Sequence, residues 1–390
     1  MSWKDYFGFT DRLRAIQSLT TAYQQANSSA AFADALDQAK QCENRAYENA
    51  ITKEEYDSIC QRAIDTAEGE RSPDSIVSDS HHSQNGIEES EASSGECIGR
   101  YKCFPHFAGL HSSIYKSKIS DGTVLAVKVT IPHMMTAPHD AYREARLLRE
   151  AHHPNVVAVT ETVDLDGGRF VIVFPFMRYD FEQLLRRDMV TAAQTRSILR
   201  DLFLALQHIH GLGIIHRDIK PSNILLNSPN GPAYLADFGV AWKDGDVGSE
   251  EASEKITDVG TTCYRPPEIL FGYKAYGKPL DLWAAGCVAA EAITVGHRQL
   301  FDSGPVGSDL SLIFSIFKLM GTPDEQRWPE VKSLPDWGKV EFHSFPQQAW
   351  EDILPGASSN GRDLVSRLLC YESNERFTAA EALNHPYFAA

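Results

Sequence analysis

The stretch GIIHRDIKPSNILL, residues 213–226, is the most informative part of the sequence for the fold. It places charged and amide side chains between two runs of isoleucine and leucine: His216, Arg217, Asp218, Lys220 and Asn223. Burying a charge without a partner is costly, because an apolar interior does not replace the solvation that water provides. We therefore expect these groups either to pair with one another or to bind a ligand.

A second acidic residue further along the chain favours a ligand. Asp237 stands between apolar residues in LADFGVA, residues 235–241, two positions before Gly239, whose lack of a Cβ atom frees the backbone. Two buried acids and an asparagine suggest a divalent cation, since Mg²⁺ takes oxygen ligands from carboxylates and from substrate phosphates. The combination of HRDxxxxN with DFG indicates phosphoryl transfer far more specifically than either motif alone.

The composition is that of an ordinary globular protein, with 390 residues of which 43% are hydrophobic. The formal charge of -16 argues against general attraction to nucleic acid or to an acidic membrane, and favours basic partners. Seven cysteines without CxxC spacing indicate a reducing compartment. No signal pattern opens the chain, and no apolar run approaches the roughly 20 residues that span a bilayer. We expect a cytoplasmic or nuclear protein.

The composition of the chain changes twice along its length. In residues 1–68 apolar side chains recur at helical spacing, as at Phe9 and Ile16, which predicts a helical N-terminal extension. Residues 69–96 are rich in serine and acids and nearly lack large apolar side chains, which predicts a disordered acidic linker.

The remaining sequence predicts a small sheet followed by a larger helical region, an α+β architecture. TVLAVKVTI (123–131) and RFVIVFPFM (169–177) are typical of strands. HDAYREARLLREA (139–151) has the spacing of an amphipathic helix, and AAQTRSILRDLFLALQHIHGLG (192–213) is a long helix closed by glycine. Later segments are mostly helical, with loops rich in proline and glycine.

With these motifs in order, residues 100–389 resemble eukaryotic protein kinases over the full length of that fold. The resemblance implies a bilobal kinase domain at 97–390, with an N-lobe of about 97–176 and a C-lobe of about 177–390. It implies that Lys128 holds the ATP phosphates and pairs with Glu144, a helix acid. Lys220, two residues after Asp218, is typical of the serine/threonine branch.

The same resemblance implies the remaining roles in the site. Asp218 orients the substrate hydroxyl and accepts its proton, Lys220 neutralises the γ-phosphate, and Asn223 and Asp237 bind Mg²⁺. The implied contacts of ATP are Gly109, Ala126, Lys128, Phe174, Pro175, Met177, Asn223 and Asp237. Of these, Phe174 closes the back of the adenine pocket, and the carbonyl of Pro175 and the backbone of Met177 bond the base edge. Glu268 and Arg376 are expected to form a buried structural pair.

The glycine-rich loop departs from the family pattern. FAGLHSSIY (107–115) keeps only Gly109 at a glycine position, with Phe107 and Ser112 at the others. Glycine lets the backbone approach phosphate closely, so the cover over the nucleotide is expected to differ. Because the metal ligands, the lysine and the catalytic acid are intact, we expect ATP binding and transfer. The alternative is a pseudokinase scaffold.

Several stretches are similar to the cyclin-dependent kinase branch. PHDAYRE (138–144) stands where that branch has PSTAIRE, and GTPDE (321–325) lies in a similar helical-lobe insertion. The change in PSTAIRE argues against ordinary cyclin binding. The irregular glycine loop and the acidic activation segment, residues 237–268, are two further departures. The three features together are similar to those of the monomeric fungal kinases that activate cyclin-dependent kinases. The expected substrates are therefore proteins, including cyclin-dependent kinases; the alternative is a cyclin-partnered or proline-directed kinase, with Arg265 shaping the pocket beyond the target residue.

The activation segment raises one further question. In such kinases Arg217 normally pairs with a phosphothreonine, but the aligned position here is Ile256. The acids Glu250, Glu251 and Glu254 are candidates to supply that negative charge. A solvated acidic loop is the competing interpretation.

Overall fold

The computed structural model describes residues 9–26, 32–50, 52–69, 95–109, 112–304 and 307–389. The chain forms two compact units, Met1–Ser94 and Gly95–Ala390. Most of the predicted linker lies outside the described residues, and its two ends belong to regular elements. Gly69 is the last residue of helix α3 and Glu96 is the first residue of strand β1.

Within its described residues the N-terminal unit forms three helices that contact one another, α1 (Phe9–Ala26), α2 (Phe32–Asn49) and α3 (Lys53–Gly69). One charged group is buried among their apolar side chains. The Glu43 carboxylate, fully buried, accepts hydrogen bonds from Arg12 of α1 at 2.7 Å and from the Tyr56 hydroxyl of α3 at 2.9 Å. Burial and this hydrogen bond to Glu43 raise the pKa of Tyr56. Glu43 therefore joins all three helices through partners that offset its desolvation.

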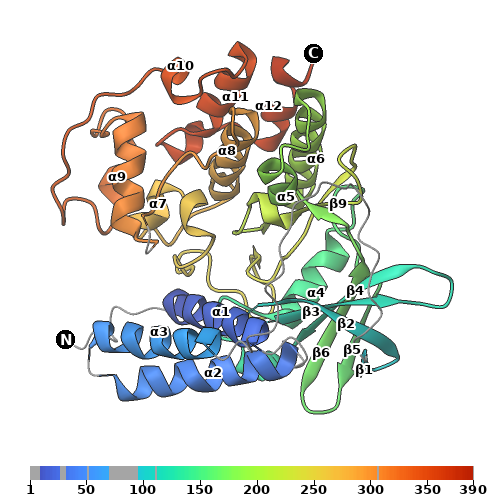
Figure 1. The fold of residues 1–390 in the computed structure, drawn as a ribbon. Coiled ribbons are helices and arrows are strands. Elements are labelled where there is room, and N and C mark those ends of the chain that lie inside the picture. Colours follow the sequence, from blue (N-terminus) through green and yellow to red (C-terminus); the bar gives the residue numbers. More distant parts are fainter. Residues whose placement is uncertain are drawn as a thin grey trace, which may run out of the picture. The chain divides into compact units, whose positions relative to one another are not determined.

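The second unit begins with a six-stranded antiparallel sheet in the order β1-β2-β3-β4-β6-β5 (Figure 1). Its strands are β1 (Glu96–Ile98), β2 (Tyr101–Ala108), β3 (Ser112–Lys118), β4 (Val124–Thr130), β5 (Glu161–Leu165) and β6 (Arg169–Pro175). Helix α4 (Ala141–Glu150) buries Ala141 and Ala145 against Phe170 of β6. The Asp140 side chain caps this helix by accepting from the Arg143 amide. The predicted strands at 123–131 and 169–177 and the predicted helix at 139–151 are thus confirmed.

The rest of the unit is mainly helical. Its helices are α5 (Phe181–Arg186), α6 (Ala192–Gly211), α7 (Pro267–Leu270), α8 (Pro279–Ile293), α9 (Asp309–Met320), α10 (Trp350–Ile353), α11 (Ser359–Leu368) and α12 (Ala379–Leu383). Short strands β7 (Tyr179–Asp180), β9 (Ile224–Leu226) and β10 (Ala233–Leu235) form one small sheet, and β8 (Ile214–Ile215) pairs with β11 (Trp242–Lys243). The predicted α+β fold of two lobes is confirmed.

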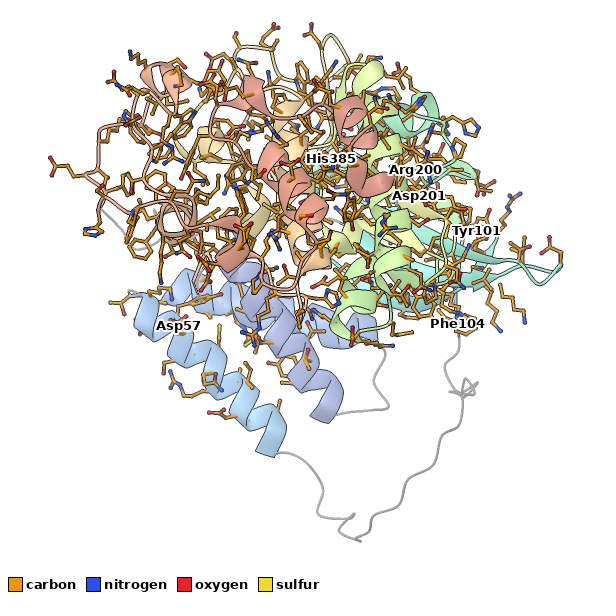
Figure 2. All side chains as sticks on the ribbon, turned by 90° about the horizontal axis from the view of Figure 1, so that it is seen from above. Asp57, Tyr101, Phe104, Arg200, Asp201 and His385 are labelled. Carbon is orange, nitrogen blue, oxygen red and sulfur yellow. The ribbon has the colours of Figure 1, made fainter. Side chains whose placement is uncertain are left out.

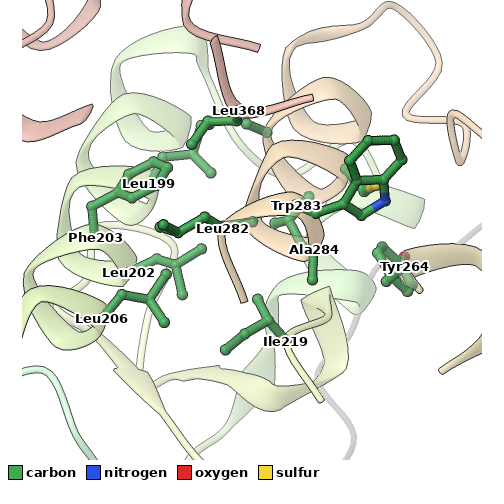
Figure 3. Close-up of a cluster of buried hydrophobic side chains, with 14 of the residues drawn as sticks. Leu199, Leu202, Phe203, Leu206, Ile219, Tyr264, Leu282, Trp283, Ala284 and Leu368 are labelled. Atoms are coloured by element: carbon green, nitrogen blue, oxygen red, sulfur yellow. The ribbon is translucent and has the colours of Figure 1, made fainter. Parts of the chain in front are cut away.

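The core of the helical lobe lies where α6 and α8 meet (Figure 3). Leu202 and Leu206 of α6 and Leu282 of α8 are almost fully buried there, together with Ile219, which follows the HRD motif. Gly286 allows α8 and α11 to approach closely, since a Cβ atom there would lie 2.9 Å from Leu368. Ile219 therefore anchors the HRD loop to a close-packed layer formed by these two helices.

None of the helices in the described ranges combines the length and the apolar character needed to cross a bilayer.

Candidate active site

The predicted lysine and helix acid lie in contact. Lys128 Nζ on β4 is 2.7 and 2.9 Å from the two carboxylate oxygens of Glu144 on α4, and both residues are buried. Burial alone lowers the pKa of Lys128, but the neighbouring carboxylates of Asp237 and Glu144 outweigh it and raise this pKa. Burial also raises the pKa of Glu144, against the attraction of Lys128. The pair links sheet to helix and keeps an ammonium ready for an anionic ligand.

Asp237 of the DFG motif is the third member of this cluster. Its Oδ1 atom lies 2.9 Å from Lys128 Nζ, while 48% of its side chain is exposed. The positive charge of Lys128 holds the pKa of Asp237 well below its usual range, so the group is a carboxylate at neutral pH. Its backbone has a φ of 65°, and the next glycine, Gly239, accepts a hydrogen bond from the Asp140 amide at 3.2 Å. The motif is thereby tied to the first turn of α4.

Asp218 lies in a dense set of polar contacts on the catalytic loop. One carboxylate oxygen accepts from the Thr261 amide at 3.0 Å and from its hydroxyl at 2.9 Å. The other oxygen lies 2.8 Å from Lys220 Nζ and 3.1 Å from the Asn223 amide nitrogen. Lys220 also donates to Thr261 Oγ1 at 2.8 Å. The structure therefore brings Asp218, Lys220 and Asn223 together and adds Thr261 to them.

Asp281, on α8, holds the backbone of this loop. Its fully buried carboxylate accepts from the His216 and Arg217 amides, both at 2.8 Å, and lies 2.9 Å from His210 Nε2. Arg217 has a φ of 68°, a strained conformation for a residue with a Cβ atom, which these contacts hold in place. The His216 ring packs edge-on against Phe238 at 4.8 Å, which joins HRD to DFG.

Asn223 and Asp237 are the predicted metal ligands, and their chemistry fits a hard cation. The Asn223 amide nitrogen donates to the Asp218 carbonyl at 2.8 Å, so its amide oxygen is the atom left for a metal. Asn223 O accepts from the Ala236 amide at 2.9 Å, which fixes the chain on either side of both ligands. One carboxylate and one amide oxygen are the donors that Mg²⁺ takes when nucleotide phosphates and water complete its shell. No cluster of three or more histidine, cysteine or acidic side chains suited to a metal occurs among the described residues.

The predicted adenine contacts lie along β4 and β6. In the register of these strands Ala126 faces Phe174, and Leu125 faces Pro175. Ala126 is two residues from Lys128, so the apolar wall and the ammonium share one strand. Met177 follows the end of β6, where the chain leaves the sheet.

The glycine-poor loop between β2 and β3 has a compact turn. The Gly109 amide donates to Ser112 O at 2.8 Å, and a Cβ atom on Gly109 would lie 3.2 Å from the Phe107 ring. The Phe107 side chain is 55% exposed. Residues 110 and 111 lie outside the described part of the chain.

Sequence reasoning missed Thr261. Its only signal is its place in GTTCYRPPE (260–268), just before the segment end that the motif RPPE marks. A threonine in a loop has many uses, and only the fold brings it to Asp218.

The family model for the protein kinase domain matches residues 108–388. The chain belongs to the protein kinase family. The kinase is similar to the serine/threonine-protein kinase csk1 of Schizosaccharomyces pombe, with 36% identity over 60% of this chain and 77% of that protein. It is 34% identical to human cyclin-dependent kinase 20, over 72% of this chain and 80% of that protein.

A third relative is the cell division control protein 2 homolog 2 of Trypanosoma brucei brucei, 35% identical over 74% of the kinase and 78% of that protein. The protein is thus a serine/threonine kinase of the cyclin-dependent-kinase-like group, a family whose members generally use ATP and Mg²⁺. These matches do not favour a scaffold without catalytic activity.

Proposed function

We propose that this kinase phosphorylates the activation-segment threonine of cyclin-dependent kinases and works as a monomer without a cyclin. The observation that carries the proposed independence of a cyclin is that a single chain holds Lys128 against Glu144 at 2.7 Å, with Asp237 alongside. The proposed substrate is supported by the resemblance of PHDAYRE and the acidic activation segment to the monomeric fungal kinases that activate cyclin-dependent kinases. Helix α4, where the cyclin-dependent branch has its partner-binding PSTAIRE motif, has this position in the single chain, which supports activity without a cyclin.

In the proposed reaction the residues of this chain divide the work. Lys128, positioned by Glu144, binds nucleotide phosphate, and Ala126 and Phe174 bury the adenine. Asn223 and Asp237 hold Mg²⁺, which neutralises charge on the transferred phosphoryl group when it is bound.

Asp218 acts on the protein substrate. Its carboxylate, oriented by Thr261 and Asn223, aligns the incoming hydroxyl and accepts its proton, while Lys220 offsets negative charge beside it. These groups are fixed before substrate arrives, so little reorganisation accompanies transfer.

The test is transfer from ATP to a purified cyclin-dependent kinase that carries an unphosphorylated segment threonine. A matched substrate with that threonine replaced by valine is the control, and the Asp218→Asn enzyme is the blank. We expect one phosphate on the threonine, added by the chain alone. Activity that appears only after a cyclin is added would instead establish the cyclin-partnered alternative.

We also propose that the kinase is cytoplasmic or nuclear. All seven cysteines are free thiols, which supports a reducing compartment. Imaging of a fluorescent fusion in cells tests this, and a secreted or lumenal signal would contradict it.

A further inference from the structure

Arg217, next to the catalytic acid, reaches a carboxylate in the activation segment. Its Nη1 atom lies 2.9 Å from Oε1 of Glu250, and the two side chains are 0% and 14% exposed. Arg217 also donates from Nε to Val240 O at 2.5 Å and from Nη1 to the Tyr276 hydroxyl at 3.1 Å. The Glu250 backbone is fixed in turn, since its carbonyl accepts from the Trp242 indole at 2.8 Å.

Glu250 lies among positively charged groups, which also interact with Asp140, Asp244 and Asp246. Arg143 of α4 lies near enough to act on it electrostatically, and so does Lys255. Lys255 is 3% exposed, with its ammonium 4.5 Å from the Trp242 ring centre and 5.1 Å from that of Tyr276. Burial raises the pKa of Glu250, but the hydrogen bond and charge of Arg217 outweigh it, so the net shift is downward.

The other acids of the segment do not share this position. Glu254 pairs with Lys274 at 2.9 Å in an exposed contact, and Glu251 is exposed. Three buried atoms at the site have no hydrogen-bond partner within the described residues: Arg143 Nε, Arg217 Nη2 and Glu250 Oε2. Two of these atoms are donors and one is an acceptor, so Glu250 does not use all the hydrogen bonds that the cationic groups offer. A phosphoryl group, with three acceptor oxygens, would use more of them.

Residues 243–248, just before Glu250, form ion pairs and hydrogen bonds with helix α4. Asp246 lies 2.9 Å from Arg146 Nη2, which also donates to Val247 O at 2.8 Å, and Lys243 pairs with Glu150. These helix residues, with Arg143, fall on one face at i, i+3 and i+7 spacing. Arg143 Nη1 donates to Gly248 O at 2.7 Å, where the backbone has a φ of 83°.

We propose that residues 243–250 are a built-in clamp in which Glu250 replaces segment phosphorylation and the preceding residues replace a partner protein in holding α4. Kinase activation loops are commonly ordered when a new phosphate pairs with arginine. Here a permanent carboxylate occupies that place, so Glu250 is a positioning residue that acts on Asp218 through Arg217. The inference rests on the kinase family and not on the proposed substrate.

The experiment uses the full chain made in bacteria, treated with phosphatase and shown by mass spectrometry to be free of phosphate. Transfer to a generic basic protein such as histone gives kcat and KM without reliance on the proposed target. We expect the phosphate-free chain to be active alone. Glu250→Gln should lower kcat about tenfold or more, because a charge-assisted bond is lost, with KM for ATP nearly unchanged. Glu250→Asp should restore much of kcat.

Glu251→Gln is the matched control, an identical change at the adjacent exposed residue, and should leave kcat unchanged. Hydrogen exchange on the phosphate-free wild-type chain gives a second readout that needs no variant: the amides of 243–256 should be protected. The proposal is overturned if phosphatase abolishes activity, if the segment exchanges freely, or if Glu250→Gln matches Glu251→Gln in kcat. Activity on histone without activity on a cyclin-dependent kinase overturns the proposed substrate only.

The grip on α4 is tested by exchanging charges. Arg146→Glu should lower kcat, and the double variant Arg146→Glu/Asp246→Arg should recover part of the loss. A double variant no more active than the single one would remove this pair from the clamp.

Discussion

Arg376 and Glu268 form a buried ion pair with two parallel hydrogen bonds, of 2.6 Å from Nη1 and 2.7 Å from Nη2. The pair joins the end of the activation segment to the C-terminal part of the lobe, and Arg376 Nε also donates to Cys370 O at 2.9 Å. Its formation confirms the expectation from the sequence. The end of the activation segment is therefore anchored to the C-terminal part of the lobe.

Removing one partner of this pair should destabilise the protein strongly. Glu268→Gln leaves the Arg376 charge buried and uncompensated, which we expect to lower the free energy of unfolding by about 3–5 kcal/mol. Urea denaturation measures the change. Glu325→Gln, which breaks the exposed Lys332–Glu325 pair, is the control and should cost no more than about 1 kcal/mol. Equal effects of the two variants would contradict a structural role for the buried pair.

Asp218→Asn should separate catalysis from nucleotide binding. The carboxylate contacts Thr261, Lys220 and Asn223 and faces the substrate hydroxyl, so we expect turnover to be abolished. Affinity for Mg²⁺-ATP, measured by calorimetry, should stay within a few-fold. A large loss of affinity would place Asp218 in the nucleotide site instead.

Asp237→Asn should instead change nucleotide binding. This change removes a metal-ligand charge and the 2.9 Å partner of Lys128, so binding of ATP should lose its dependence on Mg²⁺. Titration of ATP with and without Mg²⁺ measures this. If Mg²⁺ strengthens binding equally in both proteins, the metal has other ligands.

Asp281 should make stability fall in acid. Burial raises the pKa of its carboxyl, but the hydrogen bond and charge of His210, with the His216 amide, outweigh burial and lower it. A carboxylate with a folded pKa below its unfolded value of about 4 adds stability that is complete above that value and is lost as pH falls. Asp281→Asn should therefore lower the melting temperature at pH 7 more than at about pH 3, below the unfolded pKa. Melting curves across this range check the sign, and a constant difference would exclude the linkage.

Thiol reactivity should follow burial. Burial is the largest cause that raises the pKa of Cys60 and of Cys103 to about 11, whereas Cys97 is exposed. Because the thiolate is the reactive form, iodoacetamide at pH 8 should modify Cys97 first and the two buried thiols only on unfolding. Peptide mass spectrometry over time reads the order. Early modification of Cys60 would show that the N-terminal helices open readily.

The sequence alone indicated the lobes and the candidate site, because HRDxxxxN and DFG bring specific side chains in a fixed order. It could not indicate which of several similar charged residues form long-range contacts. Arg146 and Asp246 are a hundred residues apart, and nothing local distinguishes Asp246 from other surface acids. The fold likewise selects Glu250 from three nearby glutamates.

Short strands at the edge of the sheet could not be predicted from the sequence either. Strand β1 has three residues, and its first residue, Glu96, falls within the predicted linker. A strand this short shows no alternation of apolar and polar residues from which the sequence could reveal it. Long-range contacts define this edge. The hydroxyl of Tyr101, labelled in Figure 2, donates a hydrogen bond to Glu161 at 2.5 Å, and Arg100 pairs with the same carboxylate at 2.6 Å.

Gly248 shows how little separates the two lobes of the kinase. A Cβ atom on this residue would lie 2.9 Å from Asp140 Oδ2, the carboxylate that caps α4. Alanine at this position, as in Gly248→Ala, would both meet that carboxylate and have to take a φ of 83°, which favours glycine, so the cap of α4 or the turn itself must shift. A change at this exposed turn therefore bears on the start of the helix that carries Glu144, although neither Gly248 nor Asp140 belongs to a hydrophobic core.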